Sequence, residues 1–275
     1  MAITKILGIV NLTKDSFSDG GLYLDPDDAL AHARRLLADG ADVLDLGAES
    51  THPDAEDVPA EEEIARLDPV VRTLKAEGAR ISVDTYKPTV IRHVARLGVD
   101  YINDITAYRN PEAIEAVENI DAKLILMHSR SAAARAKRRE TAPDTLISEI
   151  QKFFEERIAM LTEAGIARER LILDPGMGFF LGSNPQASLT VLRHLQHLRD
   201  LGLPLLVSTS RKSFIGAILG EPDAPRPTSQ RGIGTLTTEI WAVLQGAEYI
   251  RTHDVLALRD AIKILDELKP ERTAL

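Results

Sequence analysis

The sequence predicts a single-domain (β/α)8 barrel over residues 1–275, and three observations lead to that prediction. Short apolar runs of β type alternate with amphipathic segments of helical type along the whole chain, a pattern that indicates a parallel sheet with crossover helices. Eight such units can be counted, which is the number that closes a barrel of this size. A local pattern also recurs at 39–45, 97–103 and 245–251: a helix end, a glycine, a small residue, an acid and two apolar residues.

The elements follow in order from apolar runs and their boundaries. The expected strands cover residues 6–10, 43–46, 81–83, 101–102, 124–127, 171–173, 205–207 and 249–250. The expected helices cover residues 25–39, 61–77, 88–97, 112–117, 145–164, 185–201, 213–219, 232–245 and 256–268. Prolines and acids near helix starts, and glycines after helix ends, set many of these boundaries. A doubly wound open sheet is the runner-up, although no Gly-rich nucleotide motif follows the first strand.

Composition narrows the class of protein. Hydrophobic residues make up 44% of the chain and there is no cysteine, which excludes disulfides, thiolate nucleophiles and cysteine-bound metals. No apolar run approaches the ~20 residues that span a bilayer. The formal net charge is −9, which argues against broad nucleic-acid binding. We therefore expect a cytoplasmic protein without a signal peptide, with small molecules rather than nucleic acid or a membrane as partners.

Polar residues recur where the predicted strands end, and in a barrel such positions meet at one face. Amide and carboxylate groups suit a flat heterocycle with N–H donors, whereas lysine, arginine, histidine and asparagine can hold an anion. Asp45 is interpreted as structural. The expected set is Asn11, Asp45, Asp84, Asn103, His128, Asp174, Lys212, Arg251 and His253.

Seven short segments carry a resemblance to one enzyme family. They are GIVNLTKDSFSDGG (8–21), ESTHP (49–53), SVDT (82–85), IND (102–104), DPG (174–176), SRKS (210–213) and RTHDV (251–255). In this order and spacing they resemble the dihydropteroate synthases over nearly the whole chain. The resemblance implies a transferase of folate biosynthesis. It would join 6-hydroxymethyl-7,8-dihydropterin diphosphate to para-aminobenzoate and release 7,8-dihydropteroate and pyrophosphate.

The resemblance also implies a role for individual residues, and it implies a homodimer. The pterin would be bound by Asp84, Asn103, Asp174 and Lys212, with Arg251 stacked on it. The diphosphate would be bound by Asn11, Arg251 and His253, with Mg²⁺ near Asn11 as the cofactor. Thr51 would line the diphosphate side and Ser213 the aminobenzoate side. The residues expected to act in catalysis are Asn11, Lys212, Arg251 and His253.

Three segments depart from the usual pattern of the family. His52 replaces the usual arginine of the second loop and Asp54 the usual glycine, while 179–181 (FFL) and 129–131 (SRS) replace other usual residues. Segments 179–181 (FFL) and 127–129 (MHS) are similar to the sulfonamide-resistant branch of the family, whereas Glu49 and Tyr108 are similar to the chromosomal form. We expect reduced sulfonamide sensitivity. Two alternatives are a pterin-dependent methyltransferase barrel and a non-catalytic pterin-binding paralogue.

Overall fold

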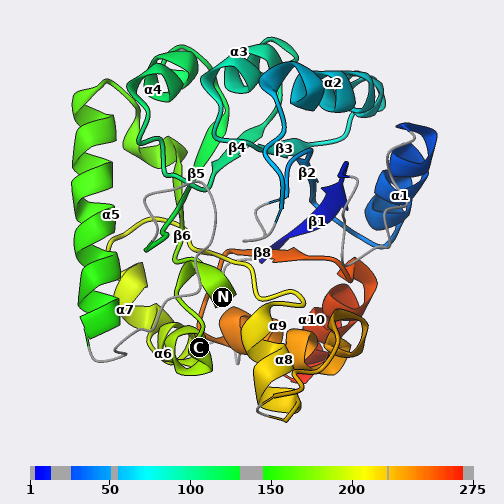
Figure 1. Ribbon diagram of the computed structural model, residues 1–275, viewed down its shortest axis with the longest axis vertical. Helices are drawn as coiled ribbons and strands as arrows, with labels where there is room; N and C mark the ends of the chain where they lie inside the picture. Colours follow the sequence, from blue (N-terminus) through cyan, green and yellow to red (C-terminus); the bar gives the residue numbers. More distant parts are fainter. Residues whose placement is uncertain (1–3, 14–25, 51–54, 131–144, 222, 269–275) are drawn as a thin grey trace, which may run out of the picture.

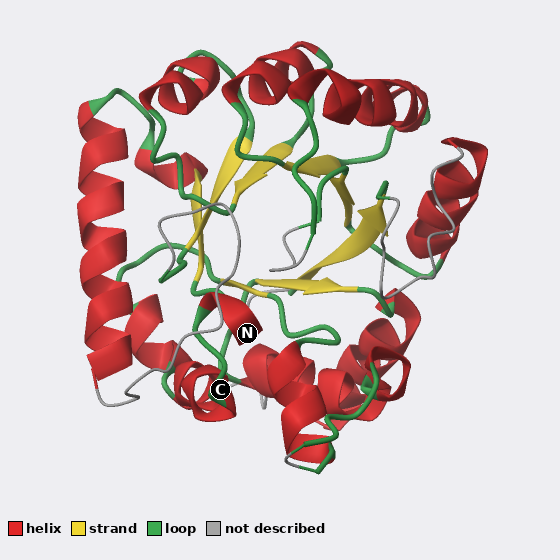
Figure 2. Ribbon diagram, viewed as in Figure 1, coloured by secondary structure: helices red, strands yellow, loops and turns green. Residues whose placement is uncertain are grey.

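The protein is an eight-stranded parallel barrel surrounded by helices (Figures 1 and 2). The computed structural model describes residues 4–13, 26–50, 55–130, 145–221 and 223–268. The strands are β1 Lys5–Asn11, β2 Val43–Gly47, β3 Ile81–Asp84, β4 Tyr101–Asp104, β5 Lys123–Met127, β6 Leu171–Asp174, β7 Leu206–Val207 and β8 Tyr249–Thr252.

The strands follow one another in chain order around the barrel, from β1 through β6 on one side and to β8 and β7 on the other. A parallel bridge between Leu173 and Leu205 joins β6 to the start of β7, and Leu173 N donates to Pro204 O at 2.9 Å. This closure confirms the predicted barrel, and the runner-up open sheet is wrong.

Helices cover the outside of the ring in Figure 2. Asn110 and Asn184 cap α4 and α6 by accepting from the backbone N–H groups of Glu112 and Gln186, and a proline begins each of these helices. The helices are α1 Pro26–Ala38, α2 Ala60–Ala76, α3 Pro88–Arg96, α4 Pro111–Val117, α5 Leu146–Glu163, α6 Pro185–Arg193, α7 Leu195–Arg199, α8 Ser213–Leu219, α9 Gly232–Leu244 and α10 Val255–Leu268. Short 3₁₀ turns lie at η2 Arg168–Arg170, η3 Gly178–Phe180 and η4 Thr228–Gln230.

One predicted helix is interrupted. The sequence predicted a continuous helix over 185–201, but the structure has α6 and α7 with a break at His194. The His194 ring Nδ1 lies 2.8 Å from Thr190 O, to which its own backbone N–H also donates. Because the backbone at His194 is not helical (φ −118°, ψ 20°), the chain changes direction there.

The apolar core has two layers on either side of the barrel wall. The larger layer lies between the strands and the helices and includes Leu44, Val83 and Leu124. The smaller layer fills the inside of the barrel and consists of Leu7, Val43, Tyr101, Ile125, Ile172, Leu206 and Tyr249. In the part of the chain that the structure describes, no helix is long and apolar enough to cross a membrane.

Candidate active site

Alternation along the strands brings a set of polar side chains to the carboxyl-terminal mouth of the barrel. Inward apolar residues are followed two positions later by polar ones: Val43 by Asp45, Tyr101 by Asn103, Ile172 by Asp174 and Tyr249 by Arg251. Successive side chains point to opposite faces of a strand, so these polar groups form the layer directly above the apolar interior. Asp84 joins them, because it pairs in register with Asn103.

Arg251 holds two carboxylates of this layer. Its Nε donates to Asp45 Oδ2 at 2.5 Å, and its Nη2 donates to Asp84 Oδ2 at 3.1 Å. The Asp45 side chain is completely buried. Asp45 therefore neutralises Arg251 inside the barrel, in agreement with its interpretation as a structural residue.

Asp174 ends β6, and Lys212 follows β7, the strand that pairs with β8. Asp174 is buried, and its Oδ1 accepts a hydrogen bond from Gly176 N at 2.8 Å. Gly176 has φ +70°, and a Cβ there would lie 2.3 Å from His128 O, so only glycine fits this turn. Lys212 precedes α8, and its Nζ lies 5.1 Å from the centre of the Phe180 ring.

Burial and neighbouring charges shift the pKa values of the ionisable groups at the mouth. Burial raises the pKa of Asp84 to about 7, against the opposing effect of Arg251. Burial also raises the pKa of Asp174 to about 6. Burial and the neighbouring Arg251 lower the pKa of Lys212 to about 8. Three carboxyl groups, including that of Asp45, thus face two cations, an arrangement that suits a ligand with N–H donors.

Buried polar atoms without a protein partner support a ligand site here. Among the described residues, Asn103 Oδ1, Ser82 Oγ and Asp45 Oδ1 are buried and accept or donate no hydrogen bond. Such groups are rare in folded proteins and cost free energy unless a ligand or water satisfies them. Asp45 and Asn103 belong to the polar layer above the apolar interior, here called the inner polar layer, and Ser82 lies two residues before Asp84 on the same face of β3. The mouth of the barrel is therefore the candidate site.

Asp174 should make the unliganded protein less stable at neutral pH. The pKa of Asp174 is about 6 in the fold and about 3.9 in an unfolded chain. Its stabilising contribution is therefore present below the unfolded pKa and is lost as the pH rises through 6. At pH 8 we expect Asp174→Asn to raise the free energy of unfolding by about 2–3 kcal/mol, because the amide can still accept from Gly176 N.

The measurement is urea-induced unfolding of the two unliganded proteins at pH 4 and pH 8. The difference between them should vanish at the lower pH. Glu115→Gln, which changes an exposed carboxylate of α4, is the control and should behave like the parent protein at both. A difference for Asp174→Asn that does not change with pH would contradict the prediction.

His253 and Ser210 lie beside Arg251 at the ends of β7 and β8, and they hydrogen-bond each other. Ser210 Oγ lies 2.8 Å from His253 Nδ1 and accepts from the backbone N–H of His253 at 3.1 Å. Burial, followed by the nearby charge of Arg211, lowers the pKa of His253 well below its ordinary value. Its ring is therefore neutral at physiological pH and can donate through only one nitrogen.

Asn11 ends β1, with Gly47 as its register partner on β2. Among the described residues, no group of three or more His, Asp or Glu side chains is arranged to hold a metal ion. Mg²⁺ is usually bound by one or two protein oxygens together with substrate phosphates. The single amide oxygen of Asn11 fits that manner of binding, with a diphosphate as the other ligand.

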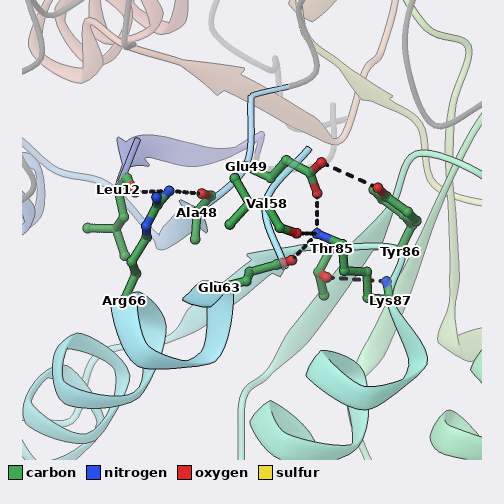
Figure 3. Close-up of polar contacts among 9 residues, drawn as sticks. All are labelled: Leu12, Ala48, Glu49, Val58, Glu63, Arg66, Thr85, Tyr86 and Lys87. Atoms are coloured by element: carbon green, nitrogen blue, oxygen red, sulfur yellow. Dashed lines mark hydrogen bonds and ion pairs between the residues drawn. The ribbon is translucent and has the colours of Figure 1, made fainter. Parts of the chain in front are cut away.

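Thr51 and His52 lie outside the described residues, but the chain on either side of them is held firmly (Figure 3). Lys87 Nζ donates to Glu49 Oε2, to Val58 O at 2.6 Å and to Glu63 Oε2 at 2.7 Å. The three protons of the ammonium group are thus all used. Glu49 and Val58 flank residues 51–54, so Lys87 joins the two ends of the second loop.

Arg66 of α2 makes a similar link between two loops (Figure 3). Its Nη1 donates to Ala48 O at 2.8 Å and to Leu12 O at 3.4 Å, and its Nη2 contacts Glu62. Leu12 follows β1 and Ala48 follows β2. The first turns of α2 therefore fix the point where both loops leave the barrel.

His128 does not join the site, so that part of the sequence prediction is wrong. Its ring packs edge-on against Phe153 and Phe154 of α5, with centroids 5.0 and 6.5 Å apart. The reason is the alternation of side chains along β5. Ile125 faces the inside of the barrel, so Met127 also points inward and His128 points toward the helices. The other predicted residues that the structure describes meet at the mouth.

Some residues that support the site were not predicted. Ser82 lies two residues before Asp84, and the same two-residue period could have identified it. Ser210 lies in the segment 210–213 that carries the resemblance, which could have identified it. Lys87 and Glu63 carry no signal of either kind, because they and their partner Glu49 are distant from one another in the sequence.

Comparisons with known proteins agree with this geometry. A family model described as pterin binding enzyme matches residues 7–253. The chain is 49% identical over 263 residues to a dihydropteroate synthase type-3 of Escherichia coli, covering 95% of this chain and 98% of the relative.

Solved structures give the same result. The dihydropteroate synthase of Xanthomonas albilineans with 4-aminobenzoic acid has a TM-score of 0.87 and 39% identity, covering 98% of this chain and 94% of that one. The enzyme of that organism in complex with 7,8-dihydropteroate has a TM-score of 0.83 and 37% identity, covering 98% and 95%. This chain therefore belongs to the pterin-binding enzyme family, and within it to the dihydropteroate synthases, which are transferases.

Proposed function

We propose that this chain condenses 6-hydroxymethyl-7,8-dihydropterin diphosphate with para-aminobenzoate, giving 7,8-dihydropteroate and pyrophosphate. One observation carries the proposal: carboxyl and amide groups of β3, β4 and β6 lie together with Lys212 and Arg251 at the barrel mouth, with unpartnered buried atoms among them. Two structures of the similar enzyme from Xanthomonas albilineans hold 4-aminobenzoic acid and 7,8-dihydropteroate.

The inner polar layer is suited to the pterin. Asp84, Asn103 and Asp174 would accept hydrogen bonds from the amino and ring N–H groups, while Lys212 would donate to a ring acceptor. Arg251 offers a planar face on which the ring can stack. Fixing the ring in this way orients its exocyclic carbon toward the aminobenzoate.

Asn11, Arg251 and His253 would hold the diphosphate. Bond cleavage between the carbon and the diphosphate oxygen leaves negative charge on the leaving group, and fixed donors stabilise that charge. Mg²⁺, when bound with Asn11, would supply further charge neutralisation. Thr51, outside the described residues, is proposed to line this side.

The aminobenzoate would lie beside Ser213, at the first residue of α8. Its nitrogen forms the new bond to the carbon, the bond to the diphosphate breaks, and the amine loses one proton. An arylamine is already neutral at pH 7, so the reaction needs no strong general base. The site accordingly needs to orient and stabilise rather than to activate the nucleophile.

We also propose reduced sensitivity to sulfonamides, which compete with para-aminobenzoate. The segment Phe179–Leu181 borders the proposed aminobenzoate site, because Phe180 contacts Lys212 and a Cβ at Gly178 would lie 3.1 Å from Ser213 Oγ. Aromatic bulk in this position can restrict a ligand larger than the substrate.

A homodimer is proposed from the apolar side chains that α8, α9 and α10 expose. Ile233 is 81% exposed and Ile264 62% exposed, and Ile218, Trp241, Leu244, Leu256 and Leu268 are also exposed. These three helices lie together in Figure 1, and clustered apolar side chains are typical of association surfaces. Light scattering that gives the mass of one chain would contradict this.

The function is tested by measuring pyrophosphate release from the dihydropterin diphosphate with Mg²⁺, with and without para-aminobenzoate. We expect release that depends on the amine, with dihydropteroate formed, and weak inhibition by sulfonamides in the same assay. Asp84→Asn should lose turnover, whereas Asp260→Asn on the exposed face of α10 should retain it. Pterin binding without release would contradict the proposal.

A further inference from the structure

The turn that follows β4 contains two adjacent residues in a backbone conformation that residues with a side chain rarely adopt. Ala107 has φ +55° and Tyr108 has φ +56°, and both values lie in the left-handed region that favours glycine. Strain of this kind persists only where the surrounding structure fixes it, and it is concentrated at functional sites. This turn begins directly after Asn103, a residue of the inner polar layer.

Asp104 accepts the three backbone N–H groups of the turn from Thr106 to Tyr108. Its Oδ1 accepts from Thr106 N at 2.6 Å and from Thr106 Oγ1 at 2.7 Å, and its Oδ2 accepts from Tyr108 N at 2.9 Å. Its carbonyl oxygen accepts from Ala107 N at 2.9 Å. Asp104 is completely buried, and burial raises its pKa to about 6. At pH 8 it is therefore ionised, and its side chain acts only as an acceptor.

Arg157 of α5 holds the other side of the same turn. Its Nε donates to Ala107 O at 3.0 Å and its Nη2 donates to Tyr108 O at 2.6 Å, so it binds the carbonyl groups of both left-handed residues. Arg157 is 6% exposed. The Tyr108 ring is fully buried, and its hydroxyl donates to Ile102 O at 2.8 Å. The turn is thus fixed at its N–H groups, at its C=O groups and through the side chain of its second strained residue.

The turn sets the place of Ile105 at the mouth of the barrel. Asn103 faces the mouth, and Ile105, two residues further along, takes the same face. Ile105 is buried in an apolar cluster with Met127 and Phe180, and Met127 also points inward. Only Asp104 separates Asn103 from Ile105, so the turn determines where both side chains lie.

We propose that Asp104 and Arg157 are positioning residues for the pterin, which together hold the strained turn that places Asn103 and Ile105 at the mouth. The inference rests on the proposed function, in which the unpartnered Asn103 Oδ1 accepts from the pterin. A relaxed turn returns residues 107 and 108 to ordinary backbone conformations. The chain on either side then moves, and the amide of Asn103 loses its alignment with the ring.

The affinity for pteroic acid, measured by titration calorimetry at pH 8, tests this proposal. Arg157→Met keeps much of the alkyl chain, but both carbonyl groups lose their donor. We expect the dissociation constant to rise roughly tenfold, the effect of one misaligned hydrogen bond. Asp104→Asn loosens the turn from its N–H side and should give the same change, so either variant can be used where the other does not fold. Unchanged affinity would overturn the proposal.

Glycine at position 107 distinguishes relief of strain from a general loss of stability. Glycine adopts a positive φ without strain, so the turn then depends less on Arg157. Ala107→Gly alone should bind pteroic acid like the parent protein. The double variant Ala107→Gly with Arg157→Met should recover part of the affinity that the single variant loses. A double variant as weak as Arg157→Met would show that Arg157 does not act by opposing strain, which would overturn the proposal.

Arg170→Met is the matched control. Arg170 is also a partly buried arginine that binds backbone carbonyl groups: its Nε donates to Ala122 O at 3.0 Å and its Nη2 donates to Val117 O at 2.8 Å. It lies directly before β6, at the end of the barrel opposite the mouth. Its loss should lower the stability of the protein but leave the affinity for pteroic acid unchanged. An equal loss of affinity in Arg170→Met would overturn the proposal.

Pyrophosphate with Mg²⁺ serves as the second ligand. Around the closed barrel, β4 is separated from β8 by three strands on either side, so the affinity for pyrophosphate should change little in Arg157→Met. Loss of both affinities in that variant would indicate general disruption of the barrel and overturn the positioning role. A parent protein that binds pyrophosphate but not pteroic acid would overturn the proposed function, and this inference with it.

Discussion

Arg251→Met is expected to lower the free energy of unfolding by about 3–5 kcal/mol, because it leaves a buried charge without its partner. The Asp45 side chain has no exposure at all, and Arg251 Nε is its ion-pair partner. Asp84 loses the second nitrogen of the same guanidinium group. Chemical denaturation of the unliganded protein measures the change.

The matched control is Arg72→Met. Arg72 also pairs with an aspartate, Asp68, but its side chain is 61% exposed, and such pairs contribute about 0–1 kcal/mol. The double variant Asp45→Asn with Arg251→Met should recover part of the loss, since the fully buried carboxylate that lost its partner is then absent. A single variant as stable as the control would show that Asp45 does not depend on Arg251.

The same substitution should weaken pyrophosphate binding on the order of 100-fold, the loss expected when one partner of a buried charge pair is removed. Titration calorimetry with pyrophosphate and Mg²⁺ measures this at a temperature where the variant is folded. Unchanged affinity would remove Arg251 from the proposed diphosphate site, while the stability result would still stand on the ion pairs.

Lys87→Met should have the second large effect, again about 3–5 kcal/mol of unfolding free energy. The ammonium group is shared by two carboxylates whose side chains are 8% exposed (Glu49) and 1% exposed (Glu63). Methionine fills the space of the alkyl chain but leaves the two acids facing each other. Burial already raises the pKa of Glu63, and loss of the cation raises it further.

The pH dependence of this loss has a definite sign. A folded pKa that lies above the unfolded one gives stability that disappears as the pH rises. The difference between Lys87→Met and the parent protein should therefore be larger at pH 8 than at pH 5. Lys75→Met is the control: this lysine of α2 also pairs with a carboxylate, Asp100, but the two side chains are 26% and 32% exposed. An equal loss of unfolding free energy in Lys75→Met and Lys87→Met would contradict the prediction.

The barrel and most of the candidate site could be predicted from the sequence because both depend on patterns that recur over a few residues, such as an apolar strand that ends in a polar residue. Strand ends and helix caps are local features, and the seven family segments fix their order. His128 was assigned wrongly because a strand end alone does not tell which face a side chain takes; counting in steps of two from Ile125 would have placed it outside. The break at His194 depends on the imidazole ring of His194, which contacts the same carbonyl oxygen of Thr190 as its own backbone N–H. The spacing of apolar residues does not indicate such a contact.

The ionic contacts were beyond sequence reasoning for a different reason. Lys87 meets Glu49 and Glu63 only because α2, α3 and the second loop converge (Figure 3), and the three residues share no spacing that indicates this. The hydrogen bond between Ser210 and His253 likewise joins the ends of β7 and β8. Such contacts follow from the closed barrel and not from any single element.

The closure of the barrel between β6 and β7 has a thermodynamic consequence. This seam is held by the Leu173–Leu205 bridge and by a strand of only two residues, so it is the part of the wall where local opening requires the least free energy. Asp174 ends the strand on one side of the seam, and Lys212 follows the strand on the other. A pterin bound to both, as proposed above, would connect the two sides of the seam, and slower amide exchange along 171–174 and 205–207 would report that it is bound.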